Sequence, residues 1–500
     1  MYQGFIMLFN SFEFIIFFPI VVLIYLIIPK RIKPVWLLAA SYYFYMCWNA
    51  KYIFLIIFTT LITYIAALLI DKSEKKPLRK FCLTFGITVN LLVLFLFKYF
   101  DFFLGNLNNV LSLAGKSQVS NPFDLLLPVG ISFYTFQAIG YVIDVYRGDV
   151  AAEKNIINYA LFVSFFPQLV AGPIERSKNL LTQIKSIREK NLFKYDSMVS
   201  GFGLMLWGLF LKTNIADRAA IVVDEVFGNY QIYGTVELVI AALLFTLQIY
   251  ADFAGYSSIA IGAARVMGIN LCMNFNTPYF AVSLADFWSR WHISLSTWFK
   301  DYVYIPLGGN RKGKIRKYLN LLITFLVSGL WHGASWNFVV WGLLHGIYRV
   351  VGEITTPARS FIVDKLQVKK DVFSFNLLRR IITFILVSFA WIFFRAKTLS
   401  LATDYISRMF TRFNPWALFD ESVYNIGLNR SEFSILAVCL VVLFAVSAVS
   451  YKRKEDIGAI MARQNLWFRW LVYIVAVVVI LVYGVYGIHF DSTKFIYFDF

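Results

Sequence analysis

The chain has 500 residues, of which 59% are hydrophobic and only 15% are charged, and its mean hydropathy is +0.66. Soluble domains carry about 45–50% apolar and about 25% charged residues, so this composition excludes an ordinary soluble enzyme. The net charge of +18 does not predict a nucleic-acid partner, because the basic residues gather in loops between apolar runs. Membrane lipids with anionic headgroups are the partner that this charge predicts.

Apolar runs of the length that crosses a bilayer recur along the chain and predict a polytopic all-α membrane protein. The first 20 residues lack the basic segment and cleavage site of a signal peptide, which predicts a retained first span. With the basic loops in the cytoplasm, both chain ends fall outside. One membrane domain is predicted over residues 1–500, with about ten full spans near residues 12–28, 35–50, 52–70, 82–104, 125–146, 199–222, 236–255, 377–395, 433–450 and 466–489.

Two further segments are predicted to be re-entrant. Residues 156–171 are short, have basic flanks on both sides and lead into FFPQLVAGP. Residues 319–350 also lie between basic loops, and about 32 residues are too many for one span and too few for two. Twelve helical residues, rising about 18 Å, precede a cluster of small residues, SGLWHGAS. We expect a broken hairpin with its apex deep in the membrane, where irregular backbone must be buried in protein or line a cavity.

The chain has only four histidines, and ionisable groups within membranes point to function. His332 lies at the predicted hairpin apex, where a neutral imidazole is suited to accept a proton from a hydroxyl. A hydrogen-bonded structural histidine is the alternative. His345 is predicted to be structural, and His489, near the end of the last span, to be interfacial.

His292 lies in DFWSRWHISLSTWFKDYVYIPLGG, where aromatic and charged residues alternate as in an interfacial helix. On one helix, Asp286 and Arg290 would pair, and His292 and Ser296 would share a face. His292 is either a site residue or a structural one. The basic, glycine-rich stretch PLGGNRKGKIRK that follows predicts either a site for a phosphorylated ligand or a loop that obeys the positive-inside rule.

Other polar residues give weaker signals. Asp252 is placed at the end of a predicted span, where it either lines a cavity or caps the next helix. The four cysteines show no CxxC spacing and no HExxH motif occurs, so neither a disulfide framework nor a metal site is predicted.

Several long stretches resemble the membrane-bound O-acyltransferase (MBOAT) family, in particular its bacterial branch of alginate and peptidoglycan O-acetyltransferase membrane proteins. They are FFPQLVAGPIER, YADFAGYSSIAIG, FWSRWHISLSTWFKDYVYIPLGG and GLWHGASWNFVVWGLLHG, with FIYFDF at the chain end. The resemblance implies a ring of tilted transmembrane helices plus re-entrant helices around a central tunnel. It also implies His332 as the catalytic histidine and His292 as a second functional one.

The resemblance further implies an acetyltransferase of the cell (inner) membrane with acetyl-CoA as the cytoplasmic donor. His332 would act as general base on an acceptor hydroxyl, and His292 would orient a group or stabilise charge. An SGNH-type partner outside the membrane would place the acetyl group on a polysaccharide of the wall or a secreted polymer. Tyr497, in the aromatic tail, is implied as an acyl relay; a tail that docks a partner or plugs the outer funnel is the alternative.

Three other functions compete with polysaccharide O-acetylation. A structural scaffold for a polysaccharide export complex would need no histidine in the membrane. D-alanyl transfer from a carrier protein to teichoic acid belongs to the same family, but its members tend to be shorter and have their tyrosine motif on a separate small protein. A transporter or flippase would also use broken helices at the midplane, but it predicts halves related by symmetry, which this sequence does not show.

Overall fold

A computed structural model describes residues 7–123, 125–170, 172–189, 194–486 and 496, and every regular element in these residues is a helix. The all-α class predicted from the sequence is therefore confirmed. The chain divides into two compact units, residues 1–202 with 259–272, and residues 203–258 with 273–500. Each unit is described by itself below.

Seven helical stretches among the described residues are apolar and long enough to cross a membrane. Only 11% of the most apolar window of the last one is buried, against 83% for Thr235–Val266, so the last helix offers most of its surface to lipid. Membrane-protein character is thus confirmed, while the number of spans stays a prediction. The seven stretches are Ala50–Lys72, Lys76–Leu113, Tyr195–Gly228, Thr235–Val266, Phe373–Arg395, Arg430–Arg453 and Leu466–Tyr483.

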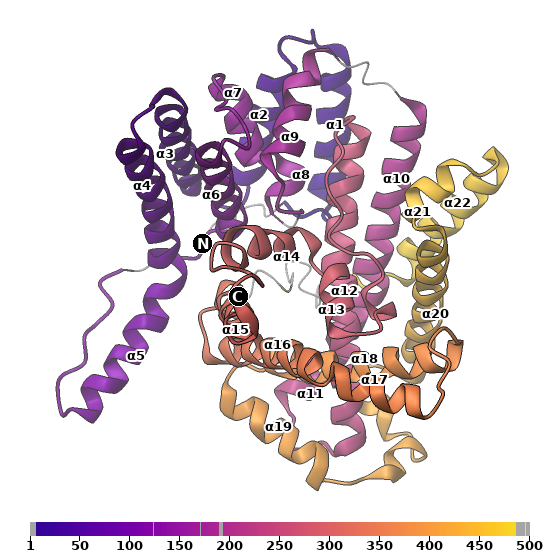
Figure 1. The fold of residues 1–500 in the computed structure, drawn as a ribbon. Coiled ribbons are helices and arrows are strands. Elements are labelled where there is room, and N and C mark those ends of the chain that lie inside the picture. Colours follow the sequence, from indigo (N-terminus) through magenta and orange to yellow (C-terminus); the bar gives the residue numbers. More distant parts are fainter. Residues whose placement is uncertain (1–6, 124, 171, 190–193, 487–495, 497–500) are drawn as a thin grey trace. The chain divides into compact units, whose positions relative to one another are not determined.

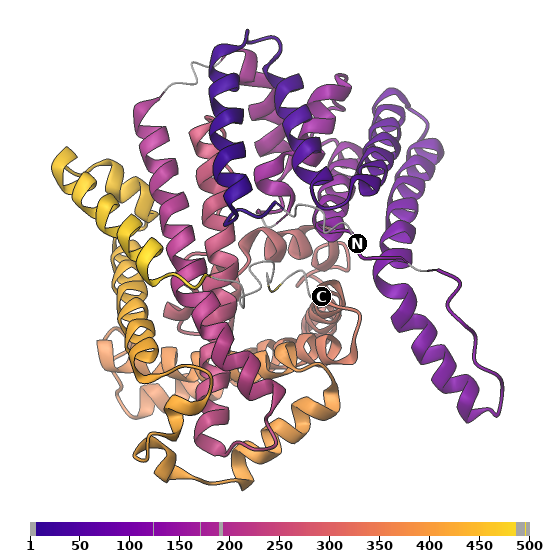
Figure 2. The same ribbon diagram turned by 180° about the vertical axis from the view of Figure 1, so that it is seen from behind.

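The first unit is built around three helices that pack side by side, α3, α4 and α6 (Figure 2). Gly86 lets the backbones of α4 and α3 approach each other, since an added Cβ would lie 3.3 Å from the Cβ of Ala66 on α3. The helices of this unit are α1 (Phe12–Ile27), α2 (Lys33–Met46), α3 (Ile53–Lys72), α4 (Lys76–Leu94), α5 (Phe100–Leu113), α6 (Ile131–Arg147), α7 (Ile156–Ser164), α8 (Phe166–Leu169) and α9 (Ser177–Lys185).

The segment at residues 156–171 forms two short helices, α7 and α8, which meet at Phe165. The break is held by side chains, because the Phe166 N–H donates to the Ser41 hydroxyl at 3.1 Å. The Gln137 amide donates to the carbonyl oxygen of Phe162 at 2.6 Å. Nine and four residues are too few to cross a bilayer as helices.

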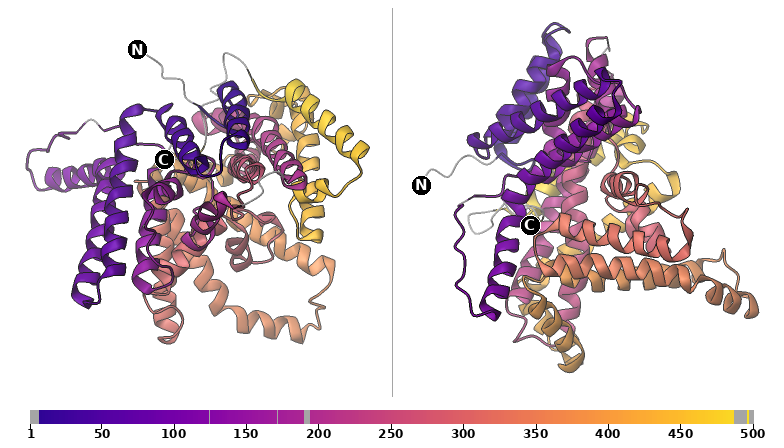
Figure 3. Two further views of the ribbon diagram at one scale, coloured as in Figure 1. Left: turned by 90° about the horizontal axis from the view of Figure 1, so that it is seen from above. Right: turned by 60° about the vertical axis from the view of Figure 1, so that its left-hand side comes forward.

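The second unit contains the helices that hold the candidate site. In it, α15, α16 and α18 lie next to one another and run across the direction of α12 (Figures 1 and 3). Its helices are the end of α10 (Tyr195–Phe210), then α11 (Asp217–Gly228), most of α12 (Thr235–Val266), α13 (Leu284–Arg290), α14 (Ile293–Phe299), α15 (Gly313–His332), α16 (Trp336–Ile354), α17 (Thr356–Lys365), α18 (Phe373–Arg395), α19 (Leu399–Thr411), α20 (Arg430–Arg453), α21 (Ile457–Ala462) and α22 (Leu466–Tyr483).

Helices α15 and α16 form a hairpin whose backbones touch at glycines. A Cβ at Gly329 would collide with the carbonyl oxygen of Phe338, and a Cβ at Gly342 with that of Phe325. The chain breaks after His332, as its small residues predicted. However, α15 begins at Gly313 rather than near residue 319, because the basic residues before 319 form its first turns. Its 20 residues rise about 30 Å instead of the 18 Å expected.

Two local predictions were wrong. Asp252 lies in the interior of the 32-residue helix α12, not at the end of a span, so it caps no helix. The single helix expected around His292 is broken between Arg290 and Ile293 into α13 and α14. The Ser296 hydroxyl accordingly donates to the carbonyl oxygen of Trp291 at 3.1 Å, and does not share a continuous helical face with His292.

The hairpin contact gives a test of the fold. Gly342→Ala should destabilise the protein by about 1–3 kcal/mol, because the new methyl group overpacks a contact between backbones. Gly352→Ala, on the same helix with nothing within 4 Å of the added Cβ, is the matched control and should be neutral or stabilising. Thermal unfolding in detergent measures both. Equal stability of the two variants would show that α15 and α16 do not touch at Gly342.

Candidate active site

His332 ends α15 and is enclosed by aromatic rings from three helices. Its side chain is buried, with Trp331 of α15 at 4.9 Å, Trp341 of α16 at 5.0 Å and Phe394 of α18 at 5.4 Å between ring centroids. All three rings meet the imidazole at steep angles. The three rings leave the imidazole in largely apolar surroundings, and a histidine accepts a proton as a general base in its neutral form.

His292 lies at the break between α13 and α14, in the left-handed conformation with φ 43° and ψ 54°. Histidine is among the few non-glycine residues that adopt this region with any frequency. The conformation is fixed on both sides, since Ile293 N–H donates to the carbonyl of Asn274 at 2.9 Å and Asn276 N–H donates to that of Arg290 at 3.0 Å. Burial lowers the pKa of His292 to about 3, so this imidazole is also neutral at physiological pH.

The two histidines come together although 40 positions separate them in the chain. Their ring centroids are 6.3 Å apart, and the ring of Trp331 lies 5.9 Å from that of His292. On the other side, Phe253 of α12 meets His292 edge-on at 4.7 Å. The sequence selected each histidine separately, and the structure unites them in one aromatic enclosure.

A small polar network supports the backbone around His292. The buried amide of Asn274 donates to the Ser257 hydroxyl at 2.9 Å, while its oxygen accepts from the Ser294 hydroxyl at 2.6 Å. The predicted pair of Asp286 and Arg290 is present at 2.6 Å. Sequence reasoning missed Asn274, because one asparagine in an apolar stretch carries no motif.

His345, which is predicted to be structural, packs against tryptophan side chains. Its Nδ1 accepts a hydrogen bond from the Trp288 indole at 3.3 Å, and the side chain is fully buried. Trp341 stands between the two histidines of the hairpin, with its ring 4.9 Å from His345 and 5.0 Å from His332. In the described ranges, no three His, Cys, Asp or Glu side chains gather into a possible metal site.

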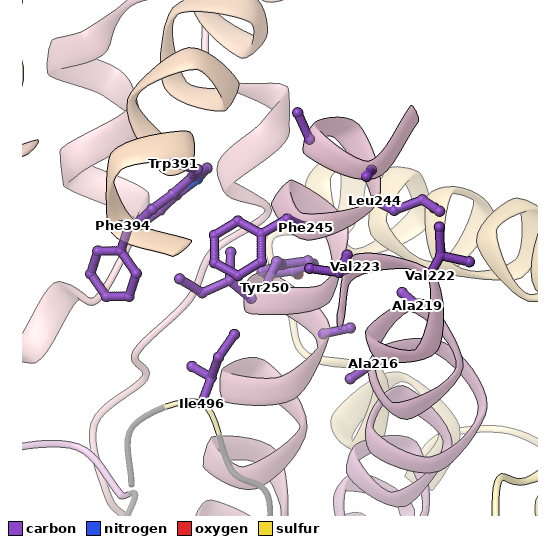
Figure 4. Packing of buried hydrophobic residues seen from close by; sticks show 14 of the residues in the cluster. Ala216, Ala219, Val222, Val223, Leu244, Phe245, Tyr250, Trp391, Phe394 and Ile496 are labelled. Atoms are coloured by element: carbon purple, nitrogen blue, oxygen red, sulfur yellow. The ribbon is translucent and has the colours of Figure 1, made fainter. Parts of the chain in front are cut away.

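The tail is described at one residue only. Tyr497 and His489 lie outside the described residues, so Tyr497 stays a prediction. Ile496 is described: its side chain joins a large buried cluster with Tyr250 and Phe394 (Figure 4). Its backbone N–H donates to Asp252 Oδ2 at 2.9 Å.

Asp252 belongs to a buried ionic group that the sequence analysis did not identify. Lys212 Nζ lies 2.8 Å from Asp217 Oδ1 and 2.8 Å from Asp252 Oδ1, and all three side chains are at most 4% exposed. A signal was present, since Lys212 and Asp217 fall inside the predicted span at 199–222, where charged residues are costly.

Comparison with known proteins identifies the class. The sequence profile of the membrane-bound O-acyltransferase family, MBOAT, matches residues 151–396. The probable alginate O-acetylase of Pseudomonas putida is 39% identical over 447 residues, which cover 87% of this chain and 85% of the relative. The peptidoglycan O-acetyltransferase of Helicobacter pylori is 36% identical over 436 residues, covering 81% and 80%. The teichoic acid D-alanyltransferase of Streptococcus thermophilus is 32% identical over 253 residues, covering 46% and 57%.

The chain is therefore a membrane-bound acyltransferase. It belongs to the MBOAT family and is an O-acyltransferase. This membership decides against the transporter or flippase that the broken helices alone left open.

The backbone of His292 allows its imidazole to be tested apart from its fold. His292→Asn should fold, because asparagine tolerates the left-handed region, and should lower acyl transfer by about 100-fold if the imidazole takes part in the reaction. His292→Val should lose folded protein as well, because a β-branched residue is strained at φ 43°. Folded yield by size-exclusion chromatography and acyl transfer measure the two effects. Full activity of His292→Asn would make the imidazole dispensable.

Proposed function

We propose that this O-acyltransferase takes an acetyl group from acetyl-CoA in the cytoplasm and delivers it across the cell membrane for O-acetylation of a polysaccharide. The observation that carries the proposal is the pair of His332 and His292, enclosed by aromatic rings at two helix breaks. The names of the relatives, alginate O-acetylase and peptidoglycan O-acetyltransferase, support a polysaccharide as the final acceptor.

In the proposed reaction, His332 removes the proton from an acceptor hydroxyl as its oxygen attacks the thioester carbonyl. A C–O bond forms, the C–S bond breaks, and the proton passes from His332 to the leaving thiolate. A thioester is activated enough that no protein nucleophile is needed. The neutral His292, 6.3 Å away between ring centroids, orients the acceptor or the carbonyl group.

The donor phosphates are proposed to lie near the basic residues at the start of α15. Arg311 and Lys312 in the preceding loop, and Lys314 and Arg316 in the first turns of the helix, are exposed. Gly308, Gly309 and Gly313 in the same stretch have positive φ, which gives the loop a sharply turned backbone. The loop and His332 lie at opposite ends of one helix, so a donor held here would reach the histidine from the basic side of the hairpin.

Outside the membrane, we propose that Tyr497 receives the acetyl group and that an SGNH-type partner passes it to the polymer. The support for a role of the tail is the burial of Ile496, its neighbour in the chain, within the cluster that includes Phe394. Phe394 in turn contacts the ring of His332.

D-alanyl transfer to teichoic acid is the second candidate. It is favoured by relatives named teichoic acid D-alanyltransferase, which are 27–32% identical over 45–46% of this chain. The alginate and peptidoglycan relatives are 36–39% identical over 81–89% of it, which supports acetyl transfer. Offering the purified protein either acetyl-CoA or a D-alanyl carrier protein separates the two.

The role of His332 has a direct test. His332→Ala should lower acetyl-CoA-dependent transfer by about 10²–10⁴-fold, the usual contribution of a general base. Thiol release by purified protein and NMR of the polymers from the mutant strain measure the loss. Gly352→Ala, which disturbs no neighbour, is the folded control. Polymer acetylation that survives in His332→Ala would leave the protein a scaffold rather than the catalyst.

The relay role of Tyr497 is tested by Tyr497→Phe, which removes only the hydroxyl. This variant should assemble normally and lose transfer to polymer, because the phenyl ring has no atom to carry the acetyl group. Tyr483→Phe changes an exposed tyrosine at the end of α22 and should transfer normally. Mass spectrometry of the C-terminal peptide should find an acetyl adduct in the wild type. Full transfer by Tyr497→Phe would reduce the tail to a docking segment.

A further inference from the structure

A buried ionic group sits beside the candidate site with no role in the reaction proposed above. Lys212 bridges Asp217 and Asp252 at 2.8 Å each, and these charges formally sum to −1 in a region that neither water nor lipid screens well. Burying such a group is expensive and commonly adds little net stability. Charged side chains inside membrane-spanning segments are therefore a reason to look for a function.

The ionic group is built on an irregular turn. Lys212 lies in the π-helical turn η4 (Leu211–Ala216), which interrupts the helix between α10 and α11. Turns of this kind occur frequently at functional sites. Gly255 of α12 allows the close approach, because an added Cβ would lie 2.9 Å from the carbonyl oxygen of Gly208. The turn thus brings Lys212 to Asp252 across two closely packed helices.

The same turn already holds the last part of the chain. Val485 N–H donates to the carbonyl oxygen of Thr213 at 3.0 Å. The Asn214 amide donates to the carbonyl oxygen of Val479 at 3.2 Å. Further on, Ile496 N–H donates to Asp252 Oδ2 at 2.9 Å. The chain is therefore fixed on the turn after α22 and again at the ionic group, four residues before its end.

Asp252 uses its two oxygens for two tasks. Oδ1 meets Lys212, and Oδ2 accepts from the peptide of Ile496. A hydrogen bond to an ionised carboxylate is stronger and shorter than one between neutral groups. The ion pair to Lys212 orients this carboxylate, so the ionic group is a fixed acceptor for one peptide N–H.

Neighbours of the anchor contact the histidines. Phe253, the next residue on α12 after Asp252, meets His292 edge-on at 4.7 Å. Phe394 belongs to the same buried cluster as Ile496 (Figure 4), and its ring lies 5.4 Å from that of His332. The contact at Asp252 therefore holds Ile496 in the unit that contains both histidines.

We propose that Asp252, oriented by Lys212, is a positioning residue that presents the C-terminal segment to the histidine pair as the acyl acceptor. The inference rests on the proposed function. In the step it serves, the phenol oxygen of Tyr497 forms a bond to the acetyl carbonyl as the C–S bond of the thioester breaks. The phenol proton moves through His332 to the thiolate. The resulting aryl ester then yields its acetyl group to a hydroxyl, and the phenol is restored.

The chain offers a matched pair of variants. Asp252→Leu and Asp217→Leu remove the same charge, and each leaves Lys212 paired with one aspartate. Only Asp252→Leu removes the acceptor of the Ile496 N–H. Asp252→Asn keeps a carbonyl oxygen at that place and should restore part of the function.

A second pair approaches the contact from the tail and leaves the ionic group intact. Ile496→Pro removes the N–H donor, because proline has none, while Ile496→Val keeps it with nearly the same side chain. These variants keep the test open if a substitution at Asp252 reduces the yield of folded protein.

Two measurements on the whole protein in detergent test whether Asp252 holds the C-terminal segment in place. Hydrogen–deuterium exchange of the C-terminal peptide reports the anchor, and acetyl transfer to polymer reports its consequence. We expect Asp252→Leu and Ile496→Pro to raise exchange and to lower transfer by about ten-fold or more, the loss of one hydrogen bond to a charged group. Asp217→Leu and Ile496→Val should stay close to the wild type in both measurements.

Two outcomes would overturn the inference. Unchanged exchange in Asp252→Leu and Ile496→Pro would show that this contact does not hold the tail. Equal losses in Asp217→Leu and Asp252→Leu, with normal behaviour of Ile496→Pro, would make the ionic group a purely structural one. Failure of the proposed function would give a different result. Polymer acetylation would then persist in His332→Ala, whether or not the C-terminal segment is anchored at Asp252.

Discussion

A membrane protein has to satisfy its own backbone wherever a helix is interrupted, because lipid offers no hydrogen bonds. Both candidate histidines stand at such interruptions, His332 at the end of α15 and His292 between α13 and α14. The breaks are possible because the surrounding protein closes over them. At His292 the neighbouring loop exchanges backbone hydrogen bonds through Asn274 and Asn276. At His332 the glycine-lined contact of α15 with α16 keeps the two helices together on either side of the break.

The same constraint explains the chemistry of the site. A side chain held at an enclosed break is surrounded by protein rather than water, and here three aromatic rings contact His332. Neutral imidazole is the form that accepts a proton, and it costs less to bury than the charged form. Trp341 packs between His332 and His345, the two histidines of the hairpin. These histidines have different partners. His345 is engaged by the Trp288 indole, whereas His332 faces His292 across the aromatic enclosure.

Sequence reasoning went furthest where the signal was local. Composition predicted the all-α membrane class, and the small residues of SGLWHGAS predicted the break after His332. Sequence reasoning failed where the environment of a residue depends on partners that are distant in the chain. Asp252 was expected either to line a cavity or to cap a helix, because aspartate is a good N-cap, whereas it lies within α12 and pairs with Lys212 from the π-helical turn. The start of α15 was misplaced for a related reason, since charge was taken as a sign of loop and here the basic residues form helical turns.

In the second unit, helix α12 contributes Asp252 to the ionic group and Phe253 to the surroundings of His292. Asp252 and Phe253 are adjacent on α12, so their side chains diverge by about 100° around the helix axis. One direction leads to Lys212 and the chain end, the other to His292. A hydrogen bond to a carboxylate is strong and directional, which suits it to hold a peptide N–H, but an unscreened charge next to an imidazole would shift its pKa. Helix α12 accepts the Ile496 N–H at Asp252 while it presents the aromatic ring of Phe253 to His292. The ionic group and the apolar surroundings of His292 therefore lie on different sides of one helix.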